Sequence, residues 1–333
     1  MAFTSPNLHL VQSPVKEPKK VDSVLDLIGN TPLLEIQRIT EGLPRSVRLY
    51  AKLEGFNPGG SVKDSPELRM IQEGLRTGKL RPGKTILDST SGNTGIALAM
   101  IGCVLGYPVE LVVPGNVSNE RKLIINAYGA KVTYSDPMEG SDGAIRFYRT
   151  ILEANPEKYY KPDQYFNPMN PEAHYENTGP EIYRQTAGAI THLIAGIGTG
   201  GTVMGIGRYL KEVKPDTQVI AVEPDDALHG LEGLKHMASS IVPGIYHEER
   251  LDGKIAVSTE DAYSMVYRLS QEEGVLVGQS SGAAMFAALK VARKLNSGTI
   301  VTIFPDFGDK YLTTNLWVGW RDRMAVGNMK FSI

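Results

Sequence analysis

Four glycines occur within seven residues of this chain, in the segment Gly196-Ile-Gly-Thr-Gly-Gly-Thr202. The segment follows a short apolar stretch, Thr191–Ala195, and precedes a stretch with helical spacing, Val203–Leu210. A glycine-rich turn that leads into a helix exposes free backbone N–H groups, and the helix dipole adds to their attraction for an anion. Because glycine has no Cβ, the backbone can approach a phosphate closely. The segment therefore predicts a site for a phosphorylated ligand.

The same segment also matches the dinucleotide-binding pattern G-x-G-x-x-G through Gly196, Gly198 and Gly201. Glu223, at the end of the next strand-like stretch, lies roughly where a ribose-binding acid follows such a pattern. Taken alone, the loop leaves three interpretations open: a dinucleotide site, a site for another phosphorylated ligand, and a glycine-rich turn without a ligand.

A lysine stands at the exit of a second turn. The turn Phe56–Val62 follows the strand-like stretch Val47–Glu54 and leads through Lys63 into a predicted helix. A lysine in this place could bind a phosphate or form a Schiff base. Cations are disfavoured at a helix N-terminus, so the position favours a functional role over that of a solvated surface lysine.

Three more turns follow strand-like stretches. The turn Thr90-Ser-Gly-Asn-Thr-Gly95 suits a carboxylate or a small phosphate, although helix capping by Ser91 or Thr94 explains it equally well. The other two are Gly278–Gly282 and Pro305–Tyr311. Ligands of α/β folds bind at the carboxyl ends of strands, so we expect these turns to border one cleft.

The composition narrows the class of protein. The chain has 333 residues, of which 41% are hydrophobic and 22% charged, and its formal net charge is -2. This balance favours neither nucleic acid nor an acidic membrane surface as a partner. No apolar stretch is long enough to cross a bilayer, and the first residues lack the order of a signal peptide, so we expect a cytoplasmic protein.

The numbers and positions of cysteine and histidine argue against a disulfide and against a catalytic metal. Cys103 cannot form an intramolecular disulfide, and its apolar neighbours predict a buried position. The six histidines form no H-E-x-x-H pair, so no catalytic metal is expected.

Strand-like and helical stretches alternate along most of the chain, which predicts an α/β fold of parallel sheets covered by helices. The predicted strands are Val47–Glu54, Thr85–Ser89, Val109–Pro114, Lys131–Ser135, Thr191–Gly196, Val219–Glu223, Val275–Gly278 and Thr299–Phe304. The predicted helices are Pro66–Thr77, Thr94–Leu105, Asn119–Tyr128, Gly143–Ala154, Pro171–Thr186, Thr202–Val213, Thr259–Glu273 and Ser281–Leu295. The Pro- and Asn-rich segment Tyr159–Pro171 resembles a hinge, so we expect two lobes with a cleft between them.

Together the motifs closely resemble those of the fold-type II pyridoxal-phosphate enzymes, within them the cysteine synthase and cystathionine β-synthase family, and most of all the B-type cysteine synthases. The resemblance runs from about Val24 to Leu316. The segments that carry it are Gly29–Leu33, Asn57–Asp64, Thr90–Gly95, Gly196–Thr202, Glu272–Ala283 and Lys310–Thr314. This resemblance replaces the interpretation of Gly196–Thr202 as a dinucleotide site.

The resemblance implies a role for each candidate residue. Lys63 would form the Schiff base with pyridoxal 5'-phosphate, Asn93 would contact the ring's 3-oxygen, and Ser280 would face the ring nitrogen. The residues implied to hold the cofactor's phosphate are Gly198, Thr199, Gly200, Gly201 and Thr202. Those implied to hold the carboxylate of an amino-acid substrate are Thr90, Ser91, Asn93, Thr94 and Gln164.

The resemblance also implies the reaction. A hydroxyl at the ring nitrogen leaves that nitrogen mostly neutral, which favours β-elimination and β-replacement over transamination. The expected reaction is replacement of the β-substituent of an O-activated L-serine, O-acetylserine or O-phosphoserine, by sulfide or a related sulfur donor through an aminoacrylate. Lys63 would act as the general base. The alternatives are cystathionine β-synthase, serine or threonine dehydratase, and a non-catalytic partner of another enzyme.

The family implies a two-lobed fold like that of the tryptophan synthase β subunit. We expect an N-terminal arm at 1–21, a smaller mobile lobe at 48–168 with the carboxylate loop, and a larger lobe of 22–47 with 169–333 that carries the phosphate loop. A homodimer is expected, and a complex with serine acetyltransferase is a further partner that the family implies.

Two departures from the family pattern stand out. Ser65 replaces the arginine that usually follows Lys-Asp. The segment Leu228–Tyr246 replaces a glycine-rich loop of the plain O-acetylserine enzymes. In this segment Lys235 and His236 could meet an anionic group of a substrate, and a solvated surface loop is an equally good interpretation.

Overall fold

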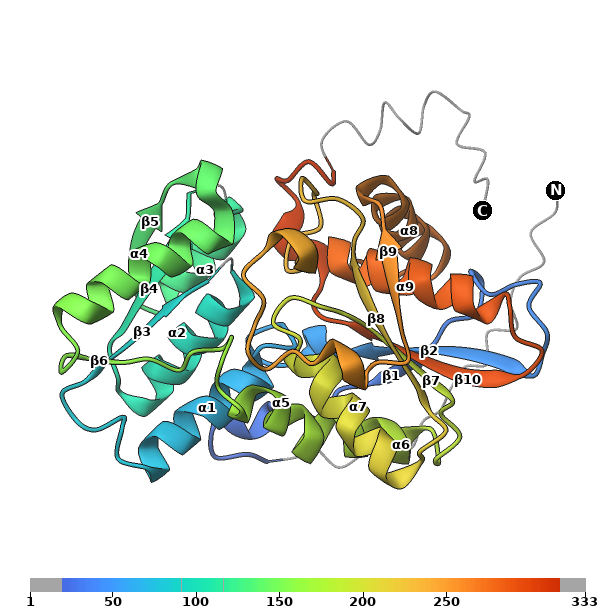
Figure 1. Cartoon of the computed structure of the whole chain (residues 1–333), viewed down its shortest axis with the longest axis horizontal. Helices are drawn as coiled ribbons and strands as arrows, with labels where there is room; N and C mark the ends of the chain where they lie inside the picture. Colours follow the sequence, from blue (N-terminus) through green and yellow to red (C-terminus); the bar gives the residue numbers. More distant parts are fainter. Residues whose placement is uncertain (1–19, 91, 116, 318–333) are drawn as a thin grey trace.

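The computed structural model describes residues 20–90, 92–115 and 117–317, which form two sheets with helices on both faces of each (Figure 1). The strands are β1 Leu33–Glu35, β2 Val47–Leu53, β3 Thr85–Ser89, β4 Val109–Pro114, β5 Lys131–Ser135, β6 Tyr159–Tyr160, β7 His192–Gly196, β8 Gln218–Pro224, β9 Gly253–Val257 and β10 Gly298–Phe304. The helices are α1 Asp64–Arg76, α2 Asn93–Leu105, α3 Asn119–Ala127, α4 Gly140–Ala154, α5 Met169–Ala173, α6 Gly179–Gln185, α7 Gly201–Val213, α8 Thr259–Glu272 and α9 Gln279–Ala292. Within these ranges no helix is both long and apolar enough to cross a membrane.

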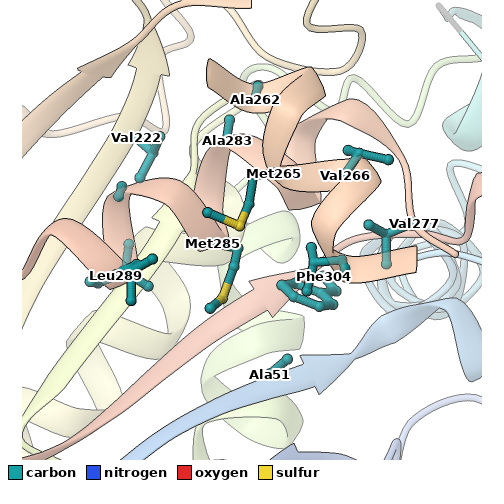
Figure 2. Packing of buried hydrophobic residues seen from close by; sticks show 14 of the residues in the cluster. Ala51, Val222, Ala262, Met265, Val266, Val277, Ala283, Met285, Leu289 and Phe304 are labelled. Carbon is teal, nitrogen blue, oxygen red and sulfur yellow. The ribbon is translucent and has the colours of Figure 1, made fainter. Parts of the chain in front are cut away.

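The larger sheet has six strands in the order β1-β2-β10-β7-β8-β9. All neighbours are parallel except β1 and β2, which are antiparallel. Helices α8 and α9 cover one face, where Met265, Met285 and Phe304 fill the space above the strands (Figure 2). Helices α6 and α7 cover the other face through residues such as Ile182 and Ile206. Burial on both faces explains the near-continuous apolar runs of β7 and β10.

The smaller sheet has four parallel strands in the order β5-β4-β3-β6. Helices α1, α2 and α3 pack on one face through Ile71, Ile96 and Ile125. Helix α4 covers the other face through Ile145 and Tyr148. The expected class, two mostly parallel sheets covered by helices, is confirmed.

Several predicted elements differ from those observed. The stretch Val275–Gly278 is not a strand, because it makes a single bridge, from Val277 to Phe307. The predicted helix Pro171–Thr186 is divided by a π-helical turn at His174–Thr178. The strands β1, β6 and β9 were not predicted, since all are short or lie at a sheet edge.

The prediction that Cys103 is buried is wrong. Helix α2 buries the residues from Thr94 to Gly102, and its last turn extends past the core, so the Cys103 side chain is exposed. The Cys103 thiol therefore lies on the surface of α2 and does not pack in the core.

Two sequence-based expectations concern the division of the chain. Strand β2 belongs to the larger sheet, so by sheet membership 48–53 lie with the larger lobe and not with the predicted smaller one. The division into a fixed and a mobile lobe stays a prediction. Residues 1–19 of the predicted N-terminal arm lie outside the described residues, as does Ser91.

Candidate active site

A cavity of about 940 Å³ lies where strands of both sheets end. The predicted site residues that line it are Lys63, Asn93, Thr94, Gln164, Gly198, Thr199, Gly200, Thr202 and Ser280. Thr90 and Gly201 lie beside these residues in the chain without lining the cavity. Segments that are up to about two hundred residues apart in sequence therefore meet at one place, as expected for the carboxyl ends of parallel strands.

The glycine-rich segment connects β7 to α7. Gly200 has a φ of +85°, which glycine adopts without strain. A Cβ at Gly198 would overlap the carbonyl oxygen of Gly233, and one at Gly201 would overlap the side-chain amide of Asn170. Only glycine fits at these two positions. The loop is therefore rich in glycine for two reasons, close packing against neighbouring residues and close approach of its backbone to a phosphate.

The loop presents free donors to the cavity. Within the part of the chain that the structure describes, no group accepts a hydrogen bond from the backbone N–H of Gly198, Thr199, Gly200 or Thr202. Unsatisfied N–H groups at the start of a helix attract a phosphate. The loop therefore has the donor set of a phosphate cradle.

Two residues without a predicted role support this loop from behind. Asn170 donates to the Gln164 carbonyl at 2.7 Å and to Thr199 Oγ1 at 3.2 Å. His174 Nε2 lies 3.2 Å from Thr202 Oγ1. Burial, and then the charge of Lys63, lower the pKa of His174 to about 3, so its ring is neutral at neutral pH and acts as a hydrogen-bonding group only.

Lys63 immediately precedes α1 and lines the cavity. Among the described residues none forms a hydrogen bond or an ion pair with its Nζ. Burial lowers the pKa of Lys63, while the charges of Glu67 and Asp306 act in the opposite direction. A lowered pKa increases the fraction of neutral amine, which is the nucleophilic and basic form.

The turn before Lys63 is held from both sides. Val62 N donates to the carbonyl of Pro305 at 2.8 Å, and Lys310 Nζ donates to the carbonyl of Gly60 at 2.6 Å. The position of Lys63 is thus fixed by the segment that follows β10.

The loop between β3 and α2 forms the second polar wall. The Thr90 hydroxyl oxygen accepts hydrogen bonds from the N–H groups of Gly92 and Gly95, both at 3.0 Å. The Thr94 hydroxyl donates to Gln164 Oε1 at 2.9 Å, and Gln164 Nε2 donates to the Ser89 carbonyl at 3.2 Å. The loop is therefore preorganised, and the free N-terminus of α2 gives it an affinity for a carboxylate.

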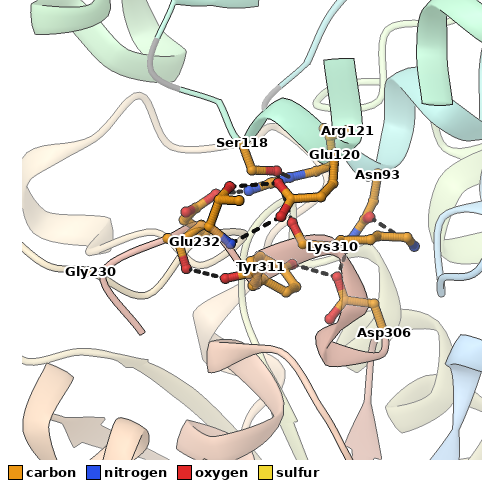
Figure 3. A network of polar contacts seen from close by, with 12 residues as sticks. Asn93, Ser118, Glu120, Arg121, Gly230, Glu232, Asp306, Lys310 and Tyr311 are labelled. Atoms are coloured by element: carbon orange, nitrogen blue, oxygen red, sulfur yellow. Dashed lines mark hydrogen bonds and ion pairs between the residues drawn. The ribbon is translucent and has the colours of Figure 1, made fainter. Parts of the chain in front are cut away.

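A polar network connects this loop with the larger lobe (Figure 3). Asn93 Nδ2 donates to Asp306 at 2.6 Å, and the Tyr311 hydroxyl donates to the same carboxylate oxygen. Lys310 Nζ donates to Asn93 Oδ1 at 3.3 Å. Both ends of the Asn93 amide are thus held by charged groups of opposite sign, which fixes its orientation.

The network continues along other residues that line the cavity. The Arg121 guanidinium lies over the Tyr311 ring at 4.8 Å and forms an ion pair with Glu232. Arg121 Nε also donates to Ser118 Oγ, whose hydroxyl in turn donates to the Lys310 carbonyl, each at 2.9 Å. Figure 3 shows that these contacts join residues of α3 to the segments after β8 and β10. They connect the two lobes at this face, as do the hydrogen bonds from Thr313 to Glu120.

Ser280 and Lys235 complete the cavity wall. Ser280 lies in the first turn of α9 and is buried. Lys235 forms an ion pair with Asp142 at 2.7 Å, which connects the segment after β8 to α4 across the cavity lining. His236 does not line the cavity, and its Nδ1 lies 2.8 Å from Ser239 Oγ.

Two other sequence patterns have structural contexts that do not suit their usual chemistry. Gly78–Thr85 matches the phosphate-binding pattern G-x-x-x-x-G-K-[ST], but it leads from α1 into β3, whereas that pattern requires a strand followed by a helix. Gly278–Gly282 matches G-x-S-x-G, but the segment before it is not a strand, and no described histidine is bonded to Ser280.

Comparisons with known proteins agree with this geometry. The chain matches the model of the pyridoxal-phosphate dependent enzymes over residues 24–306. It is 54% identical to a cysteine synthase of Aquifex aeolicus, over 90% of this chain and 93% of that protein. It is 41% identical to a cysteine synthase B of Pseudomonas aeruginosa, over 89% of this chain and 97% of that protein. A crystal structure of a cysteine synthase from Entamoeba histolytica has a TM-score of 0.86 and 37% identity, and covers 91% of this chain and 92% of that one.

The chain therefore belongs to the pyridoxal-phosphate dependent enzymes. The family, the fold class and the cofactor expected from the sequence are confirmed. The residues present also fit this cofactor on structural grounds. Lys63 lines the cavity without a partner among the described residues, which suits an aldehyde. The loop Gly198–Thr202 has N–H groups that bond to no described residue, and a Cβ would not fit at two of its glycines, which suits a phosphate.

Proposed function

We propose that this chain is a cysteine synthase, which replaces the β-substituent of O-acetylserine or O-phosphoserine by sulfide or a related sulfur donor. The observation that carries the proposal is the meeting in one cavity of Lys63, the phosphate cradle and the Thr94–Gln164 wall. These supply an amine, an anion site for the cofactor and an anion site for an amino acid. Identity to cysteine synthases over most of the chain supports the same activity.

The proposed roles follow from the geometry. Lys63 would link to the cofactor, Gly198–Thr202 would hold its phosphate, and Asn93 and Ser280 would contact its ring. When bound, pyridoxal phosphate supplies an electron sink for the charge that develops at Cα. The lowered pKa of Lys63 makes its amine available to accept the Cα proton.

We further propose that Thr90, Ser91, Asn93, Thr94 and Gln164 hold the substrate carboxylate. The N-terminus of α2 offers donors to this anion, and the hydrogen bonds of Asn93 with Asp306 and Lys310 link the loop to the larger lobe. Closure of the smaller lobe, proposed at 48–168 from the sequence and here taken without the strand β2, would exclude water from the reacting carbon and limit loss of the substrate to hydrolysis. A cytoplasmic homodimer that binds serine acetyltransferase is part of the same proposal.

The test is a comparison of donors and acceptors on the purified, cofactor-loaded protein. We expect cysteine from an O-activated serine with sulfide, and loss of this activity in Lys63→Ala but not in Lys79→Ala, which alters an exposed lysine. Turnover of serine with homocysteine alone would contradict the proposal in favour of cystathionine β-synthase. Release of pyruvate from serine without a sulfur acceptor would contradict it in favour of a dehydratase.

A further inference from the structure

A glutamate with no role in the proposed chemistry lies one helical turn beyond Lys63. Glu67 is completely buried in α1, and its N–H donates to the Lys63 carbonyl at 3.1 Å. Neither carboxyl oxygen of Glu67 has a hydrogen-bond partner among the described residues. A buried carboxylate without a partner is strongly unfavourable, so this side chain needs either a counter-charge or a proton.

The surroundings of Glu67 argue for the proton. Four groups act on its carboxyl: Lys63 at the start of α1, Asp64 of α1, Asp88 of β3 and the Thr94 hydroxyl of α2. The charge of Glu67 in turn raises the pKa of Tyr160 of β6. Lys63 is the cation of this set, and it is the residue that the cofactor would engage. Burial, and then the charge of Asp88, raise the pKa of Glu67 well above its ordinary value, and they outweigh the charge of Lys63 and the Thr94 hydroxyl, which act in the opposite direction.

The hydrogen bond from Thr94 to Gln164 determines which contact a proton on Glu67 can make. A threonine hydroxyl has one proton, and that of Thr94 is donated to Gln164 Oε1 at 2.9 Å. If Glu67 is protonated, it can donate to the free lone pair of Thr94, and both groups are satisfied. If Glu67 is ionised, it competes with Gln164 for the same proton. The charge state of Glu67 therefore decides which way the Thr94 hydroxyl points.

We infer that Glu67 is a positioning residue of the carboxylate site, which in its uncharged form fixes the Thr94 hydroxyl on Gln164. The inference rests on the proposed function, since it takes Thr94 and Gln164 as part of that site. An ionised Glu67 would also place a negative charge behind the loop that receives the substrate carboxylate. Substrate binding is therefore strongest while Glu67 holds its proton and weakens as the pH rises enough to remove it.

Two substitutions separate this role from simple packing. Glu67→Gln keeps the shape and a donor, so it mimics the protonated acid at every pH, whereas Glu67→Ala removes both. At neutral pH we expect KM for O-acetylserine within about twofold of the wild type in Glu67→Gln and about tenfold higher in Glu67→Ala, the loss of about one hydrogen bond. At alkaline pH the wild-type KM should rise relative to that of Glu67→Gln. Glu73→Gln is the matched control, because Glu73 lies on the same helix, is partly exposed to solvent and is paired with Arg76.

Infrared difference spectra of the loaded protein give a readout that needs no turnover. The carbonyl band of a protonated carboxylic acid should be present at neutral pH and lose intensity in Glu67→Gln. Equal KM increases in Glu67→Gln and Glu67→Ala, or no loss of acid band on substitution, would overturn the inference. A wild-type protein that makes no cysteine would contradict the proposed function, while the infrared result would still report the proton on Glu67.

Discussion

Replacement of Gly201 by alanine is expected to weaken the binding of pyridoxal phosphate strongly. A Cβ at this position would overlap the side-chain amide of Asn170. Asn170 cannot turn away freely, because it donates to the Gln164 carbonyl at 2.7 Å and to Thr199 Oγ1 at 3.2 Å. Either these two bonds break or the phosphate loop shifts away from the cofactor.

The size of the effect follows from those two routes. Loss of both Asn170 hydrogen bonds costs about 1–3 kcal/mol together. Forcing a methyl group into a packed site costs about 1–3 kcal/mol if nothing else moves. A loss of about 3 kcal/mol in binding corresponds to a dissociation constant about a hundredfold higher.

The assay is a titration of the apoprotein with pyridoxal phosphate, followed by absorbance, with an unfolding curve for each variant. Gly253→Ala on β9 is the matched control, because the nearest atom to its Cβ would be on Ile220 at 3.9 Å. Equal dissociation constants for the two variants would refute the assignment of this loop to the phosphate.

Two further predictions concern the carboxylate wall and the contact between the lobes. Thr94→Val removes the hydroxyl that donates to Gln164, so KM for O-acetylserine should rise about fivefold to tenfold, while the dissociation constant for the cofactor stays unchanged. Steady-state kinetics measure the KM, and a cofactor titration measures the dissociation constant. An unchanged KM would contradict the role of Thr94 in the carboxylate site. A double-mutant cycle of Arg121→Met and Glu232→Gln should give a coupling free energy of about 1–2 kcal/mol in urea unfolding, because the Arg121 side chain is 3% exposed and that of Glu232 33%. A coupling near zero would remove this pair from the contacts that hold the lobes together.

Features that depend on local composition could be predicted from the sequence. The phosphate loop was found because four closely spaced glycines between a strand and a helix are a local pattern, and the observed Gly200 backbone conformation agrees with it. The parallel sheets followed from the alternation of apolar runs with helical spacing. Strands such as β4 are buried along their whole length, which makes their pattern clear.

Features that depend on distant partners could not be predicted in this way. Asn93 and Asp306, which are hydrogen-bonded, are 213 residues apart in the sequence, and no local signal joins them. Strand β6 has two residues and is defined by its pairing with β3. The burial of Glu67 was not anticipated either, because a glutamate in a helix is usually solvated.

Reductive trapping identifies the lysine that carries the cofactor, which we propose to be Lys63. Borohydride reduction of the loaded protein, followed by proteolysis and mass spectrometry, locates the lysine that has gained a pyridoxyl phosphate group. We expect modification of Lys63 and of no other lysine. Lys235 is the informative alternative, because it lines the same cavity but is paired with Asp142. Modification of Lys235, or of no lysine, would show that Lys63 does not carry the cofactor.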